Sequence, residues 1–200
     1  MKKLLVLLTA ALLLLSGIAS AESQTAEAQL YTSENANYSM MIPADFIPVN
    51  DSFVGMVESR IKNGDLPGVD SDQLARMQAS LANVDLTQLD MILDRSLAGN
   101  INVQVQNIGI PGSMLPFVKA QLDASNLASY AAIGVDSESI TTYDMEQIGH
   151  YTWYHLSCVM LEREIQQYII SDEDGLGYIV TFTGIEAPDI ELMLSTFQFE

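Results

Sequence analysis

Cysteine is almost absent from this sequence, because Cys158 is the one cysteine in 200 residues. A single cysteine cannot close an internal disulfide, so the fold must be stabilised by its hydrophobic core. Cys158 lies in the apolar run 154–161, which is typical of a strand. We therefore expect a buried, unreactive thiol, and the alternatives are an intermolecular disulfide or a catalytic thiol.

Basic residues are also scarce. The chain has 8 Lys and Arg against 26 Asp and Glu, which gives a formal net charge of −18. Nucleic-acid binding and attachment to anionic lipid need clustered basic residues. Those beyond position 21 are scattered along the chain: Arg60, Lys62, Arg76, Arg95, Lys119 and Arg163. The composition argues against nucleic-acid partners and leaves basic proteins or divalent cations as electrostatically compatible ones.

Histidine is limited to His150 and His155. Two residues five apart in one continuous strand face opposite sides, and no cysteine or acid completes a metal-ligand set at the usual spacing. We interpret both as structural. The chain has no Gly-x-Ser-x-Gly, phosphate-loop or dinucleotide pattern, and Ser113, which follows a glycine, is interpreted as a helix cap. The sequence thus identifies no catalytic, cofactor-binding or metal-binding residue.

The first 21 residues have the pattern of a secretory signal peptide. A basic start at 1–3 precedes an apolar segment at 4–15 and the small residues at 19–21. The apolar segment is shorter than the roughly 20 residues of a membrane-spanning helix. We predict cleavage between Ala21 and Glu22, and a secreted or extracytoplasmic mature protein without a membrane span. A lipid anchor is not expected, because Glu22 stands where a lipoprotein has cysteine.

The rest of the chain is predicted to form one domain. Residues 22–28 are small and polar and are predicted to be a flexible lead-in, and residues 29–200 are expected to be a single α+β domain. A chain of this size buries about 70% of its unfolded surface. Strands are predicted from alternating or apolar runs between turn residues. They cover 29–32, 38–42, 91–97, 101–106, 139–147, 151–161, 164–170, 177–183 and 196–199.

Helical spacing of apolar residues predicts helices after Asn50, Ser71, Pro111 and Pro188. The third helix would bury the stripe Leu115, Val118 and Leu122 and continue through 126–133. The fourth would turn Ile190, Met193 and Leu194 inward. The pair Asp174-Gly175 predicts a tight hairpin between the last two long strands.

This order of elements resembles the PsbP-like fold. The residues that carry the resemblance are the strand and turn 38–46, the meander from Gly149 through Arg163 and Tyr168 to 177–182, and the closing segment 190–197 with Ser195-Thr196-Phe197. The family includes the photosystem subunit PsbP, a nuclear-import factor that binds Ran and many exported bacterial proteins. The resemblance implies an antiparallel sheet between helical layers, an α/β/α sandwich. No functional residue of a characterised member can be matched here.

Acidic and aromatic residues are the remaining candidates for a site. The loop acids Asp65, Asp70 and Asp72, and the hairpin acids 172–174, could hold calcium weakly, although the glycine and closing glutamate of an EF-hand loop are missing. Paired carboxylates could cleave glycosides, but the sequence selects no pair. The meander aromatics are interpreted as core residues, and a binding face is the alternative. They are Tyr151, Trp153, Tyr154, Tyr168, Tyr178 and Phe182.

These observations favour an exported, non-catalytic domain that binds a partner protein or a ligand through a sheet face or a helix edge. The alternatives are a carboxylate-based extracytoplasmic hydrolase and a weak calcium-binding component of the cell envelope. No cofactor is expected.

Overall fold

The structure is a computed structural model that describes residues 27–34, 36–49, 89–94, 99–132, 135–160 and 163–200. The predicted signal peptide with its cleavage site at Ala21 and Glu22 lies outside the described residues. So do the two helices predicted after Asn50 and Ser71 and almost all of the predicted lead-in.

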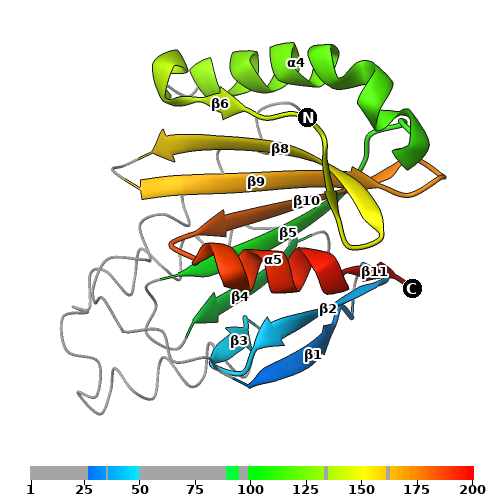
Figure 1. The fold of residues 1–200 in the computed structure, drawn as a ribbon, viewed down its shortest axis with the longest axis vertical. Coiled ribbons are helices and arrows are strands. Elements are labelled where there is room, and N and C mark those ends of the chain that lie inside the picture. Colours follow the sequence, from blue (N-terminus) through cyan, green and yellow to red (C-terminus); the bar gives the residue numbers. More distant parts are fainter. Residues whose placement is uncertain (1–26, 35, 50–88, 95–98, 133–134, 161–162) are drawn as a thin grey trace.

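A large antiparallel sheet forms the centre of the molecule (Figure 1). Its strands are β3 (Phe46–Pro48), β4 (Leu89–Asp94), β5 (Asn100–Asn107), β6 (Thr141–Thr142), β7 (Glu146–Ile148), β8 (Tyr151–Met160), β9 (Arg163–Ser171) and β10 (Leu176–Thr183). Their order is β3-β4-β5-β10-β9-β8-β6, and β7 pairs with β8 beside this path. A smaller antiparallel sheet has the order β1-β2-β11, formed by β1 (Ala28–Thr32), β2 (Tyr38–Pro43) and β11 (Gln198–Phe199).

In the described residues, four helical elements connect and cover these strands. The 3-10 helix η1 (Gly112–Val118) leads directly into α4 (Lys119–Ala131), and the short 3-10 turn η2 (Ser137–Ser139) follows. The last helix, α5 (Ala187–Thr196), lies between β10 and β11 in the chain. Figure 1 shows α5 in front of β10 and β5, and α4 along the β6 and β8 side of the sheet. No helix among the described residues is both long and apolar enough to cross a bilayer.

One face of the large sheet, here called the α5 face, packs against α5 and the small sheet. Because successive side chains of a strand alternate between faces, one set from β8, β9 and β10 shares this core with Ile190, Met193 and Leu194 of α5. That set is aromatic and aliphatic: Trp153, Tyr168, Ile170, Tyr178, Val180 and Phe182. The inward stripe predicted for the last helix is therefore confirmed.

The opposite face, here called the α4 face, has a second core under α4. Leu122 and Tyr130 of the helix pack against the other alternating set from the same strands, namely Tyr154, Leu156, Cys158, Ile165, Ile169 and Ile179. The sheet is thus sandwiched between helices. This confirms the predicted α+β class, with an antiparallel sheet and helices packed against it in layers.

The predicted hairpins are confirmed, with β1 pairing β2, β4 pairing β5 and β9 pairing β10, all antiparallel. The first part of β5 also buries polar side chains. Asn100 is 1% exposed and Asn102 6%, and the Asn102 Nδ2 donates to the Asn100 Oδ1 at 3.0 Å. A polar side chain in a strand therefore does not mark a solvated face here.

The strand predicted at 139–147 is wrong as one element. The chain forms η2, then β6, then β7, and both strands pair with β8 but at different places, Thr141 opposite Ser157 and Glu146 opposite Trp153. Between them the regular pairing is interrupted, although the Tyr143 N–H still donates to the His155 carbonyl at 3.1 Å. This irregular path brings Tyr143 and Glu146 to the same residue of β8, His155.

Ser113 is not the predicted helix cap. The residue that precedes η1 is Pro111, whose side chain makes no capping hydrogen bond. Instead the Ser113 Oγ donates to the Glu173 Oε2 at 3.0 Å. The hydroxyl that was predicted to cap the helix therefore binds a side chain 60 residues away in the sequence.

Candidate functional site

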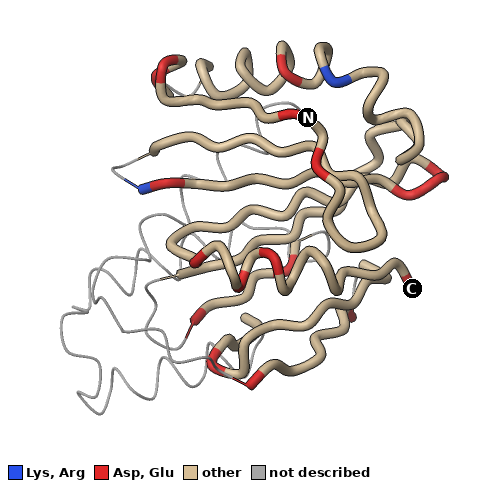
Figure 2. Tube along the Cα trace, viewed as in Figure 1, with Lys and Arg blue, Asp and Glu red and all other residues tan. Residues whose placement is uncertain are grey.

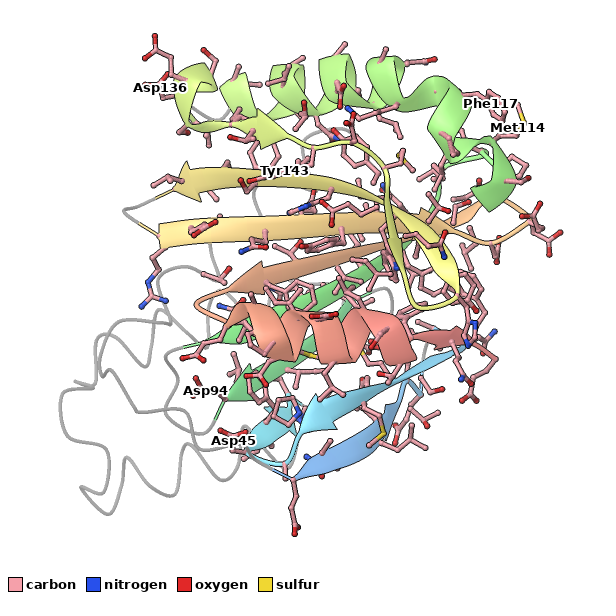
Figure 3. The ribbon with its side chains drawn as sticks, in the orientation of Figure 1. Asp45, Asp94, Met114, Phe117, Asp136 and Tyr143 are labelled. Carbon is pink, nitrogen blue, oxygen red and sulfur yellow. The ribbon has the colours of Figure 1, made fainter. Side chains whose placement is uncertain are left out.

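His155 lies between two tyrosine rings. Its ring centre is 4.1 Å from that of Tyr143, with 9° between the planes, and 4.1 Å from that of Tyr168, with 13°. Its Nδ1 is 2.8 Å from the Glu146 Oε1, while its Nε2 is buried without a hydrogen-bond partner. The outer ring is Tyr143, which is 37% exposed and is labelled in Figure 3. The Nε2 has almost no solvent-accessible surface.

The second histidine does not join this cluster. His150 is exposed in the turn between β7 and β8, whereas His155 is buried in β8. Among the described residues, no three His, Cys, Asp or Glu side chains are grouped so that they could hold a metal ion.

Cys158 is 1% exposed on the α4 face, which confirms its predicted burial. Burial raises the pKa of its thiol to about 11, and a hydrogen bond with Tyr130 opposes part of that increase. A thiol with this pKa is almost wholly protonated near pH 7 and is a weak nucleophile.

The structure describes one of the two predicted acidic sites. Asp65, Asp70 and Asp72 lie outside the described residues. At the β9–β10 hairpin, the Asp172 Oδ1 accepts hydrogen bonds from the backbone N–H groups of Asp174 at 3.0 Å and Leu176 at 2.9 Å. These two hydrogen bonds stabilise the hairpin turn, so the Asp172 carboxylate has a structural role there.

Two further acidic groups were not predicted from the sequence. One is Asp90 beside two tyrosines, and the other is Asp189 with its acidic neighbours. Burial, followed by the nearby charge of Asp90, raises the pKa values of Tyr31 and Tyr38. At the start of α5, burial and then the charges of Glu186 and Asp45 raise the pKa of the Asp189 carboxyl. Asp90 is too far from Tyr31 in the sequence, and Asp189 too far from Asp45, for a local pattern to connect them.

The most exposed apolar side chains of the helical segments lie on η1. Phe117 is 79% exposed and Met114 46%, and both project at the same end of α4 in Figure 3. We call these two side chains the η1 surface. Leu115, on the opposite side of the same turn, is fully buried. Leu115 therefore packs η1 against the domain, and Met114 and Phe117 are exposed to solvent.

Hydrogen bonds join η1 to the β9–β10 hairpin. The backbone N–H of Gly112 donates to the Asp172 carbonyl at 3.0 Å, and that of Ser113 donates to the Glu173 Oε1 at 3.2 Å. A Cβ on Gly112 would collide with the Ser171 carbonyl oxygen, so only glycine allows this close approach. An exposed phenylalanine on such a support is pre-positioned for a contact.

Acidic residues border the η1 surface. Figure 2 shows acidic residues along the tip of the β9–β10 hairpin, on the same side of the molecule as the start of α4. In the described part of the chain the basic residues are Lys119 and Arg163, and the Lys119 Nζ pairs with the Asp123 Oδ2 at 2.9 Å. The η1 surface therefore presents apolar side chains in a negative field.

The exposure of Met114 and Phe117 had a signal in the sequence. The predicted stripe of Leu115, Val118 and Leu122 places both residues off the buried side of the helix. What the stripe could not indicate is the hairpin that supports them, since the contact joins residues about sixty positions apart.

Comparison with solved structures finds similar folds. A protein of Bacteroides thetaiotaomicron shares 10% identity at a TM-score of 0.46, with 88% of this chain and 49% of that chain covered, so this chain spans about half its length. The cyanobacterial PsbP (CyanoP) of Synechocystis sp. PCC 6803 shares 15% identity at a TM-score of 0.43, covering 92% and 98%. These similarities concern the fold alone.

Comparison with family models and with curated proteins gives no match.

Proposed function

We propose that this protein is an exported, non-catalytic binding domain that recognises a partner protein through the η1 surface. The observation that carries the proposal is the 79% exposure of Phe117 on a helix that is hydrogen-bonded to the β9–β10 hairpin. An aromatic side chain with this exposure gains little hydrophobic stabilisation from the isolated domain. Aromatic residues are enriched at protein interfaces.

The partner is expected to be a protein segment that combines apolar residues with Lys or Arg. The apolar residues would cover Met114 and Phe117, and the basic ones would face Glu173 and its neighbours at the hairpin tip. A chain with 26 acidic and 8 basic residues attracts such a segment. A second copy of this chain is disfavoured as the occupant, because it would bring like charges together.

The test uses a synthetic peptide of alternating Lys and Leu and its Glu–Leu counterpart, titrated against the mature protein. We expect the Lys–Leu peptide to bind with an affinity that falls with added salt, and the Glu–Leu peptide not to bind. Phe117→Ser should weaken binding about tenfold or more. The matched control is Leu30→Ser, since Leu30 is also an exposed apolar residue, at 67%, but lies on β1.

The same two variants, Phe117→Ser and Leu30→Ser, would identify a natural partner. A protein captured from the extracytoplasmic fraction should be retained by wild type and by Leu30→Ser and lost with Phe117→Ser. Equal peptide binding by the two variants would refute the proposal, because attraction would then depend on net charge alone.

A further inference from the structure

The strand β1 is at the end of the small sheet, whose order is β1-β2-β11. Figure 1 shows β1 on the side of β2 that is turned away from α5. In the described part of the chain β1 pairs with β2 alone, so its second edge has no strand beside it. The backbone N–H and C=O groups of such an edge can be paired by another extended strand.

The pairing of β1 with β2 shows which backbone groups point to the open edge. The Ser33 N–H, just after β1, donates to the Tyr38 carbonyl at 2.9 Å. Along an antiparallel strand, every second residue turns its N–H and C=O groups toward the partner strand. Because Ser33 faces β2, the outward groups of β1 are those of Ala28, Leu30 and Thr32. All three residues are exposed.

This edge has none of the features that protect edge strands from pairing. The sequence of β1, Ala-Gln-Leu-Tyr-Thr, contains no charge, proline or glycine, and its register on β2 is continuous, without a bulge. Tyr31 packs against the core, whereas Leu30, on the opposite face of the strand, is 67% exposed. An exposed apolar side chain therefore lies at the middle of an unprotected edge.

We infer that β1 pairs antiparallel with β1 of a second copy of this chain, about a two-fold axis at Leu30. This register uses all three outward residues, because Leu30 faces Leu30 of the copy and Ala28 faces Thr32. Each facing pair exchanges two backbone hydrogen bonds, and the two Leu30 side chains cover each other across the strands. The edge is thus complementary to itself, and the two small sheets become one continuous sheet.

The charges along the edge permit this pairing. Glu27, the acid that precedes β1, would face Ser33 of the copy, so these carboxylates do not oppose each other. The net charge of −18 still repels the two copies, and a contact between two five-residue strands is short. We therefore expect a weak dimer that added salt strengthens by screening the repulsion. The edge does not include Met114 or Phe117, and the inference is independent of the proposed function.

The experiment introduces single cysteines on the edge of the mature protein and adds a mild oxidant. Leu30→Cys should form a disulfide-linked dimer, because facing Cα atoms lie about 5.5 Å apart, which a disulfide can span. Thr32→Cys is the matched control. It is also exposed, but the two copies of position 32 would be four residues apart along the pair, about 13 Å, and should not link. The buried Cys158 does not compete.

A mixture of two variants tests the register directly. Ala28→Cys and Thr32→Cys should each stay unlinked alone and should form a mixed dimer together, because these positions face each other in the proposed pairing.

Sedimentation velocity of the mature protein without added cysteines gives an independent measurement. The average mass should rise toward that of a dimer with protein concentration and with salt. Leu30→Asp places two like charges opposite each other and should raise the dissociation constant about tenfold or more. Phe117→Asp adds the same charge away from the edge and should leave the dissociation constant nearly unchanged.

Three outcomes would overturn the inference. The first is equal cross-linking of Leu30→Cys and Thr32→Cys. The second is a protein that stays monomeric at every concentration and salt. The third is a monomer whose β1 amide signals in NMR shift when the Lys–Leu peptide is added, which would assign the edge to a strand of another protein.

Discussion

The His155 imidazole and the Glu146 carboxylate are joined at 2.8 Å between Nδ1 and Oε1, and they come from strands that pair side by side. His155 is 7% exposed. The rings of Tyr143 and Tyr168 cover its two faces. This contact ties the irregular segment between β6 and β7 to the large sheet.

Removing either member of the pair should lower the free energy of unfolding. We expect a loss of about 1 kcal/mol for Glu146→Gln, because the charge of a partly exposed hydrogen-bond acceptor is lost. His155→Ala should cost more, about 2–4 kcal/mol, because it also leaves a cavity between two rings. Urea unfolding measures both, with the exposed Glu138→Gln as control. A cost for Glu138→Gln equal to that of Glu146→Gln would contradict a specific role for the contact.

Cys158 should be unreactive in the folded protein. Its thiol is 1% exposed and has a pKa raised to about 11 by burial. We expect slow modification by a thiol reagent in native buffer and rapid modification in denaturant. Fast labelling of the native protein would show that the thiol is accessible and would restore a covalent role as an alternative.

The same thiol contributes to the pH dependence of stability. Its pKa is about 11 in the folded chain against 9.0 for the unperturbed group, so the unfolded state loses the proton first as pH rises. The contribution is fully present below pH 9 and is lost as pH rises through about 11. Cys158→Ala should therefore flatten the decline in stability between these two values, measured by unfolding at several pH values. An unchanged slope would contradict the pKa assignment.

Calcium should not stabilise the protein. The Asp172 Oδ1 already accepts two backbone hydrogen bonds within the hairpin. Asp172→Ala should cost about 1 kcal/mol, whereas Asp172→Asn should retain most of the stability because its amide oxygen can accept the same bonds. We expect little change in melting temperature with free calcium. A large increase that disappears in Asp172→Asn or Asp70→Asn would instead indicate a calcium site, since a ligand that binds only the folded state stabilises it by mass action.

Cleavage between Ala21 and Glu22 is expected for the protein recovered from outside the cytoplasm. The prediction depends on the basic start, the short apolar segment and the small residues before the cleavage point. Intact-mass measurement decides it. A species that retains residues 1–21 would instead indicate a protein tethered to the membrane.

Local patterns in the sequence determined the hairpins and the last helix. Asp174-Gly175 marks the β9–β10 turn, where Gly175 has a φ of +83° that favours glycine. Pro188 marks the first turn of α5, and Ile190, Met193 and Leu194 repeat at helical spacing. These features depend on neighbours within a few residues, so the α+β class could be predicted without knowing how the strands pair.

The candidate sites depend on contacts between distant parts of the chain. Strand pairing decided that Glu146 and Tyr143 reach His155, and that Ile169 and Ile179 lie side by side under α4. The contact of Ser113 with Glu173 decided that η1 is braced by a hairpin rather than capped by its own serine. The sequence by itself determined which apolar side chains could be buried along each element, because that follows from local periodicity. Only the tertiary structure decided which of them meet, because a strand register or a helix–hairpin contact minimises the free energy of the whole chain and leaves no pattern in either segment alone.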